Sequence, residues 1–182
     1  MRLVLARVPR KADCGRYVGR DPSADAGHPV GAHLDTYQDF VQIRGGESLG
    51  EAFDRVRHRL LAYDIFPPTF LRYAFCGEGA VVEGQTIVQR FGVGVAIEAA
   101  VRVTKVWETL ELGNRVCGFA YSTLPGHPER GVATFEVRLA GDTVAVVLTA
   151  RSVARTPVVT RPVAKAIQRA ITRRAVRRLV QG

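Results

Sequence analysis

The spacing of hydrophobic residues predicts one amphipathic helix in the first half of the chain. Apolar residues recur there at steps of three and four positions: Leu49, Phe53, Val56, Leu60 and Tyr63. Such a spacing places side chains on one face of an α-helix. Ser48 and Glu51 have the spacing of a capping box, which satisfies free backbone N–H groups at a helix start. Pro67 and Pro68 stop a helix, so we expect it to end before them.

After this helix the hydrophobic period changes to two residues, which is the period of a β-strand. Six segments rich in β-branched and aromatic residues follow this pattern: 70–75, 81–91, 95–107, 114–122, 132–139 and 143–151. Segment 35–44 alternates in the same way, and a short strand is also expected within 2–8. Turns and loops that contain glycine separate the six segments, which predicts an antiparallel meander. Side chains expected to share a face are, in one segment, Ile97, Ala99, Val101 and Val103, and in another, Cys117, Phe119 and Tyr121.

The last segment, 161–180, predicts a long helix with Pro162 in its first turn. Its apolar stripe consists of residues four positions apart: Val163, Ile167, Ile171 and Ala175. This order of elements predicts an α+β fold of the helix-grip type, in which a curved antiparallel β-sheet wraps around the C-terminal α-helix and encloses a cavity. We expect residues 34–182 to form this single domain. Residues 1–33 show no sustained period and predict an irregular N-terminal arm.

Length and composition limit the class of protein. A chain of 182 residues, 47% of them hydrophobic, is long enough for one domain with a full core. No apolar run approaches the roughly 20 residues that a membrane-spanning helix requires. Arg7 and Pro9 interrupt the apolar start of the chain before it reaches the length of a signal peptide. We therefore expect a cytoplasmic protein without a membrane span.

The three cysteines do not have a recognisable pattern. Cys14, Cys76 and Cys117 are odd in number, widely spaced and without a Cys-x-x-Cys pair. This predicts neither a disulfide framework nor a zinc site. Cys76 and Cys117 are interpreted as small buried hydrophobic residues. No nucleotide-binding glycine pattern or metal-ligand cluster occurs, so we expect no cofactor and no metal.

The positive charge is confined to the end of the chain. The net charge is +9, and residues 151–182 contain nine basic residues and no acidic one. Residues that step by four along the last helix, Lys165, Arg169, Arg173 and Arg177, could form a phosphate-binding stripe. The favoured interpretation is a solvated helix face whose last arginines complement the helix dipole. Nucleic-acid binding is therefore not the expected function.

The stretch 118–131 contains the strongest candidates for chemistry. Two prolines and several glycines make it a rigid loop around ionisable groups. His127 is a candidate general acid or base, although an imidazole that caps a backbone group is the favoured interpretation. Glu129 could orient His127 or act as an acid, or it could be an ordinary loop carboxylate. Tyr121 could donate a hydrogen bond to a ligand oxygen, or it could pack in the core.

The residues from Gly118 to Gly131 closely resemble the signature of the DUF1990 family of uncharacterised proteins. Tyr63-Asp-Ile-Phe-Pro-Pro68, Val82-Glu-Gly-Gln-Thr86 and Ala150-Arg-Ser152 are similar to further segments of that family. The resemblance implies a helix-grip fold of the START/Bet v 1-like superfamily with a cavity for a hydrophobic ligand. In that superfamily such cavities carry lipids, bind hormones or metabolites, or cyclise polyketide-like substrates. Tyr63 and Arg151 depart from the residues usual in the family, which implies a different ligand.

These observations together define a candidate site. The candidate catalytic residues are Tyr121, His127 and Glu129, and the candidate ligand-binding residues are Tyr63, Phe66, Trp107, Cys117, Phe119 and Arg151. The leading hypothesis is a cofactor-free enzyme of cyclase, isomerase or dehydratase type that acts on a small hydrophobic metabolite in secondary metabolism. The alternatives are a non-catalytic carrier or sensor of hydrophobic ligands and a nucleic-acid-binding protein. The sequence leaves open whether the protein is a monomer or a homodimer.

Overall fold

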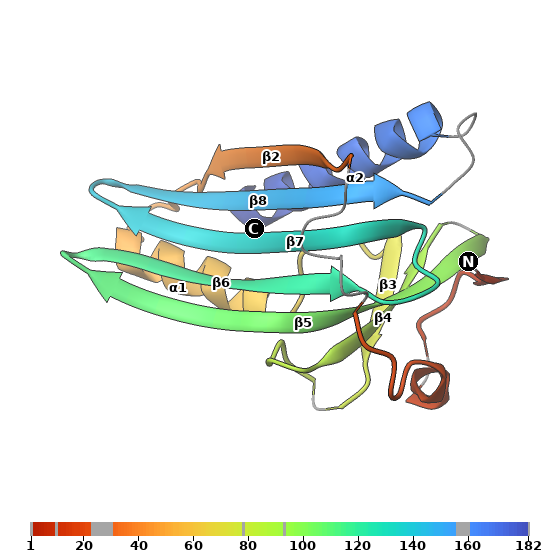
Figure 1. Cartoon of the computed structure of the whole chain (residues 1–182). Coiled ribbons are helices and arrows are strands. Elements are labelled where there is room, and N and C mark those ends of the chain that lie inside the picture. The colour runs from red at the N-terminus through yellow and green to blue at the C-terminus, as the bar shows by residue number, and fades with distance from the viewer. Residues whose placement is uncertain are drawn as a thin grey trace.

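A computed structural model describes residues 2–9, 11–22, 31–77, 79–92, 94–155 and 161–181, with side chains for all of these except 11–12 and 161–168. One antiparallel sheet of eight strands dominates the described structure (Figure 1). Its strands are β1 (Arg2–Leu5), β2 (His33–Phe40), β3 (Leu71–Phe75), β4 (Thr86–Phe91), β5 (Val95–Glu111), β6 (Asn114–Thr123), β7 (Glu129–Ala140) and β8 (Thr143–Ala154). The strand order is β2-β8-β7-β6-β5-β4-β3, and β1 pairs with β5.

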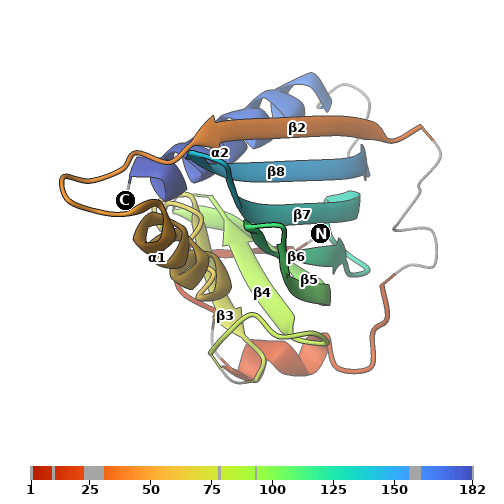
Figure 2. The same cartoon turned by 90° about the vertical axis from the view of Figure 1, so that its left-hand side faces the viewer.

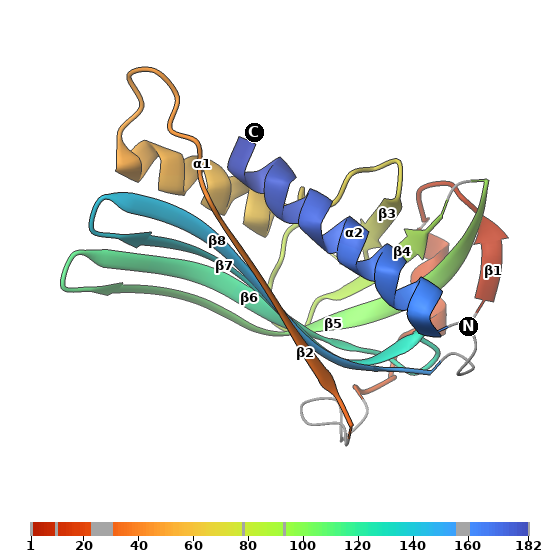
Figure 3. The ribbon, with the colours of Figure 1, turned by 90° about the horizontal axis from the view of Figure 1, so that it is seen from above.

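The sheet curves around two helices that lie on the same face. Figure 3 shows α1 (Leu49–Leu61) and α2 (Arg161–Gln181) side by side along the concave side of the long strands. Strand β2 follows the N-terminal arm, and consecutive strands from β3 to β8 are neighbours, as in a meander. The predicted helix-grip architecture is thus confirmed, with α2 as the long C-terminal helix.

The first helix begins where the sequence predicts. The Oγ of Ser48 accepts a hydrogen bond from the backbone N–H of Glu51, and a carboxylate oxygen of Glu51 accepts one from the backbone N–H of Ser48. This reciprocal pair is the expected capping box. The apolar stripe is buried, but the helix ends before Tyr63, which follows with a positive φ of 59° and is fully buried. The last member of the stripe therefore reaches the core from the connection after the helix.

The main core lies between the concave face and the helices. Phe119 of β6 and Phe135 of β7 stack with ring centroids 4.9 Å apart. Cys117 and Tyr121 lie on the same face of β6 as Phe119, as the alternation predicts. Helix α2 contributes residues from its second half: Ile171, Ala175, Val176 and Leu179. The side chains of Val163 and Ile167, the other members of the predicted stripe, lie outside the described residues.

One irregularity reverses the faces of β5. The pairing of β5 with β6 shifts register between Val103 and Lys105, which is the mark of a β-bulge. Before the bulge Val101 and Val103 point to the concave core, as predicted. After it Trp107 pairs with Gly118, and its ring lies over the convex face, where a Cβ on Gly118 would meet it at 2.7 Å.

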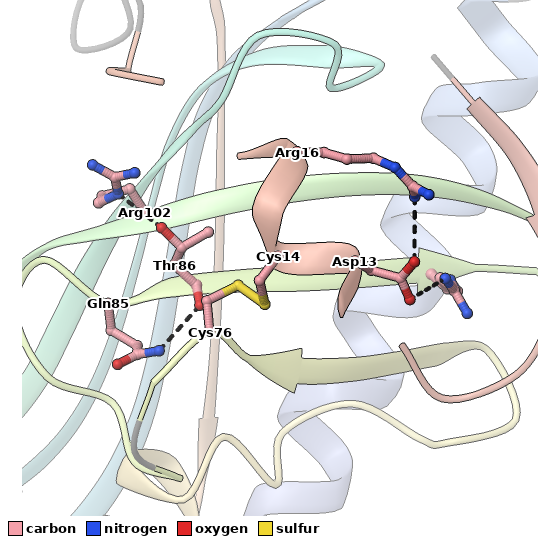
Figure 4. Close-up of a disulfide and its surroundings, with 8 residues drawn as sticks. Asp13, Cys14, Arg16, Cys76, Gln85, Thr86 and Arg102 are labelled. Atoms are coloured by element: carbon pink, nitrogen blue, oxygen red, sulfur yellow. Dashed lines mark hydrogen bonds and ion pairs between the residues drawn. A yellow bond between two sulfur atoms is a disulfide. The ribbon is translucent and has the colours of Figure 1, made fainter. Parts of the chain in front are cut away.

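The N-terminal arm contains regular structure and a disulfide. A 3-10 helix, η1 (Lys11–Arg16), lies beside β4, and Cys14 forms a disulfide with Cys76 at the end of β3 (Figures 2 and 4). The prediction that the cysteines form no disulfide is wrong. The pair is 62 residues apart, so only the packing of the arm on the sheet brings the two sulfur atoms together. Cys117 remains a free, buried thiol, as predicted.

Candidate ligand cavity

A cavity of about 280 Å³ lies between the concave face and α2. Most of its wall is apolar and comes from the segment after α1, from β3 to β8, and from α2: Phe66, Leu71, Phe91, Ile97, Phe135, Leu148 and Ile171 are examples. This volume is near the lower end of the roughly 300–1,000 Å³ usual for small-molecule sites. The cavity suits a compact, largely apolar ligand.

Polar groups enter the cavity mainly from the β6–β7 connection. Tyr121 on β6, His127 in the loop and Glu129 at the start of β7 all line it. Thr123, Ser152 and Thr172 complete the set of polar side chains in the wall. The structure therefore brings together the three candidate catalytic residues predicted from the sequence.

The imidazole of His127 caps the start of β7. Its Nδ1 lies 3.0 Å from both the backbone nitrogen and the carbonyl oxygen of Glu129, and the N–H of Glu129 donates to it. In the neutral tautomer that accepts this hydrogen bond, the proton is on Nε2. Burial lowers the pKa of His127 from 6.5 to about 4, so the ring is neutral at physiological pH. His127 thus supports the turn, and its Nε2–H is the group that remains to donate to a ligand.

This buried imidazole predicts a pH-dependent effect of His127→Gln. As pH falls below 6.5, the unfolded chain takes up a proton at this position, whereas the folded protein does so only near pH 4. The stability that the neutral His127 contributes is therefore present above pH 6.5 and is lost as pH falls toward 4. In urea unfolding, the stability difference between wild type and His127→Gln should narrow across this window.

The matched control is His58→Gln, because His58 is exposed on α1. It makes the same exchange of side chain outside the cavity wall. A stability difference between wild type and His127→Gln that stays constant from pH 6.5 to pH 4 would contradict the assignment of a buried, neutral imidazole.

The carboxyl group of Glu129 is the ionisable acid in the cavity wall. Burial raises its pKa, while a hydrogen bond from Ser152 lowers it and the negative charge of Asp35 raises it further. A carboxyl group with a raised pKa exchanges its proton closer to neutral pH than an exposed one. Glu129 is therefore suited to proton transfer or to accepting a hydrogen bond from a ligand.

Tyr121 belongs to a buried polar cluster with Tyr63 and Gln89. The Nε2 of Gln89 donates to the hydroxyl of Tyr63 at 2.5 Å, and Tyr121 interacts with both side chains. Burial raises the pKa of Tyr121 far above its ordinary value, so the phenol keeps its proton. Within the described residues the Oε1 of Gln89 has no hydrogen-bond partner. Sequence reasoning missed Gln89. A polar residue on the same strand face as Ile87 and Phe91 was nevertheless a detectable signal.

The predicted ligand-binding residues divide into four groups, of which three lie on the cavity side of the sheet. Phe66 lines the cavity. Tyr63 and Phe119 lie behind its wall, with ring centroids 6.0 Å apart, and Phe119 stacks on the wall residue Phe135. Cys117 is buried beside Arg57 of α1 and does not line the cavity.

Trp107 and Arg151 lie on the convex face, so the prediction that they bind a ligand in the cavity is wrong. The bulge in β5 turns Trp107 away from the interior. Arg151 is exposed and alternates with Ala150 and Ser152, which both line the cavity. Because successive side chains of a strand point to opposite faces, Arg151 points outward.

The proposed basic stripe on α2 is only partly described. Arg169 pairs with Asp35 at 3.4 Å and Arg173 is exposed, whereas the side chain of Lys165 lies outside the described residues.

No group of three or more potential metal ligands occurs in the described part of the chain. None of the described helices combines the length and hydrophobicity that crossing a bilayer requires.

The curved sheet, its two helices and the cavity between them define a protein of the helix-grip fold. The family model named "Domain of unknown function (DUF1990)" matches residues 16–178, and the chain belongs to that family. The resemblance of the stretch 118–131 to this family is thereby confirmed. No curated protein matches the sequence.

Solved structures share the fold at low sequence identity. A hypothetical protein from Helicobacter pylori has a TM-score of 0.52 at 11% identity, with 81% of this chain and 86% of that chain covered. The major latex-like protein 151 of Panax ginseng has a TM-score of 0.50 at 12% identity, with 83% and 99% covered. The di-domain ARO/CYC StfQ from the steffimycin biosynthetic pathway has a TM-score of 0.50 at 13% identity, with 82% and 49% covered.

Proposed function

We propose that the protein binds a small, largely hydrophobic metabolite in the cavity between the sheet and α2. The observation that carries this proposal is a mostly apolar cavity of about 280 Å³ with few, localised polar groups. Pockets of this kind bind ligands by burying apolar surface and orient them with a small number of hydrogen bonds.

The polar groups indicate which ligand features are recognised. The protonated phenol of Tyr121 and the Nε2–H of His127 are donors, so they suit a carbonyl or hydroxyl oxygen. The carboxyl group of Glu129 suits a hydroxyl or amine donor. We therefore expect a compact ring system with an oxygen acceptor and a donor group.

Filling the cavity tests this proposal. Ala150 lines the cavity, so Ala150→Phe should lower the affinity for the uncharged fluorescent probe N-phenyl-1-naphthylamine by at least about tenfold. Thr149→Phe adds a ring to the residue of β8 just before Ala150, whose side chain faces away from the cavity. This substitution should leave the affinity close to that of the wild type. Fluorescence titration measures both. An equal affinity for the wild type and Ala150→Phe would mean that the probe binds elsewhere and would refute the cavity as the site.

A second candidate function is cofactor-free conversion of the same ligand by cyclisation, isomerisation or dehydration. The raised pKa of Glu129, beside the donor Tyr121 in one cavity, favours it. In such an enzyme Glu129 would transfer a proton, and Tyr121 would stabilise charge that develops on a ligand oxygen. Mass spectrometry of ligands extracted after incubation separates the two functions, since a carrier returns its ligand unaltered and an enzyme returns a product.

A further inference from the structure

The convex face near β4 is covered by the N-terminal arm, which forms a second hydrophobic cluster. We call this set the arm cluster: Cys14, Tyr17, Val88, Ala100, Leu124 and the half-buried Cys76. Cys14 and Tyr17 come from the arm, and the others come from the sheet and from the β6–β7 connection. The disulfide between Cys14 and Cys76 links the arm covalently to the end of β3 (Figure 4).

An ion cluster beside the arm cluster depends on the same segment. Arg90 and Glu98, 3% and 1% exposed, form a buried pair between β4 and β5. Asp13 of η1 accepts from Arg90 at 2.8 Å, and Arg16 donates to Glu98 at 3.1 Å. The arm therefore supplies one anion, Asp13, and two cations, Arg2 and Arg16, to a pair that is otherwise shut off from water, and losing the arm would expose and partly unpair it.

The arm also contacts the loop that carries His127. Leu124, the first residue of the β6–β7 loop (124–128), belongs with Tyr17 to the arm cluster. Arg20 donates to the carbonyl oxygen of Pro125 at 3.3 Å. The carbonyl oxygen of Leu124 accepts from the backbone N–H of His127 at 3.1 Å, and His127 lines the cavity. One side of this loop thus rests on the arm and the other forms cavity wall.

We propose that Cys14–Cys76 is a reversible redox-modification site whose reduction releases the arm, loosens the β6–β7 loop and lowers ligand affinity. This inference rests on the proposed function and names the regulation of the same cavity. The coupling passes from Cys14 through the arm cluster to Leu124, and from Leu124 to His127 through their backbone hydrogen bond. It is a contiguous chain of contacts between the modified bond and the ligand site.

The reduction uses a dithiol as the electron donor. Cys76 is half-buried beside the exposed Gly77, whereas Cys14 is buried, so Cys76 is the more accessible residue of the pair. A thiolate of the dithiol attacks Sγ of Cys76, and Sγ of Cys14 leaves as a thiolate and takes up a proton. The second thiol of the dithiol then displaces Cys76, which also becomes a thiol. Two electrons and two protons pass to the protein, and the dithiol becomes a disulfide.

The test compares ligand affinity in the two redox states of the same chain. N-phenyl-1-naphthylamine is titrated into oxidised wild type and into wild type reduced with dithiothreitol. Reduction should weaken binding by at least about fivefold, the lower end of ordinary coupling between sites. The double variant Cys14→Ser, Cys76→Ser should bind as weakly as the reduced protein and should not respond to dithiothreitol. Equal affinities in the two states would overturn the proposal.

Two further measurements separate this inference from simple unfolding and from failure of the proposed function. Far-UV circular dichroism should stay native on reduction, and a complete loss of structure would overturn the proposal by making the disulfide a structural clamp. Amide hydrogen exchange at Leu124, Gly126 and His127 should become about tenfold faster on reduction whether or not the probe binds. If no state binds the probe, the proposed function fails, and unchanged exchange would reject the coupling on its own.

A variant with an intact disulfide tests the contact chain itself. Tyr17→Ala removes the largest side chain that the arm contributes to the arm cluster, while Cys14 and Cys76 stay linked. It should lower affinity as reduction does, because the arm no longer supports the loop. Wild-type affinity in Tyr17→Ala would reject the proposed route.

Discussion

Glu98→Gln should lower the free energy of unfolding by about 3–5 kcal/mol, the cost typical of removing one partner of a buried ion pair. Glu98 is 1% exposed, and its carboxylate accepts from Arg90, Arg2 and Arg16. Glutamine has nearly the same shape, so the substitution removes charge without making a cavity. Arg90 would keep Asp13 as an anion but would lose its closest buried partner. Urea unfolding at neutral pH measures the change.

The control for this prediction lies on the same strand. Glu108 of β5 is exposed and pairs with Arg57 and Arg115. Glu108→Gln should therefore cost no more than about 1 kcal/mol, as exposed ion pairs usually do. Equal costs for the two substitutions would show that burial does not govern the energetics of the Arg90–Glu98 pair.

Gly131→Ala should destabilise the fold by about 3 kcal/mol and weaken binding in the cavity. An added Cβ would lie 2.0 Å from the carbonyl oxygen of Arg151 and 2.7 Å from the Cα of Ser152. Both atoms belong to the backbone of β8, which cannot move aside as a flexible side chain could. The two strands would separate where Gly131 pairs with Ser152, and both residues line the cavity. Thermal unfolding and titration with N-phenyl-1-naphthylamine measure the two effects.

Gly45→Ala is the matched control for Gly131→Ala. Gly45 is exposed in the loop before α1, and an added Cβ would meet no atom within 4 Å. Its substitution should change stability by less than about 0.5 kcal/mol, as is usual for surface positions. A wild-type melting temperature for Gly131→Ala would mean that β7 and β8 adjust to the extra methyl group.

The stretch 118–131 illustrates how far local sequence reasoning reached. Its prolines and glycines predicted a rigid connection. Its parity predicted that Tyr121 shares a strand face with Cys117 and Phe119, which the structure bears out. The sequence left open whether His127 is a general acid or base or caps a backbone group of the turn, because the choice depends on distances across the loop. The structure shows Nδ1 accepting the N–H of Glu129, so the capping interpretation is confirmed.

The predictions that failed concern features that depend on contacts between distant parts of the chain. Parity in β5 holds up to Val103 and fails at Trp107, because a bulge inserts one residue without a pattern in the sequence. The bond between Cys14 and Cys76 has no local signature across 62 residues. The role of Gln89 as a hydrogen-bond donor is evident only from its contact with Tyr63, which lies in the connection after α1.

The sequence by itself determined the elements and their order: the capped first helix, the strands of the meander, the long last helix and the family. These features follow from hydrophobic period, capping residues and turn residues, which act over a few positions along the chain. Tertiary structure alone decided which side chains line the cavity and that the N-terminal arm is fastened to the convex face. Those outcomes depend on strand register and on the pairing of charges and sulfurs far apart in sequence, because packing in three dimensions, not local spacing, selects such partners.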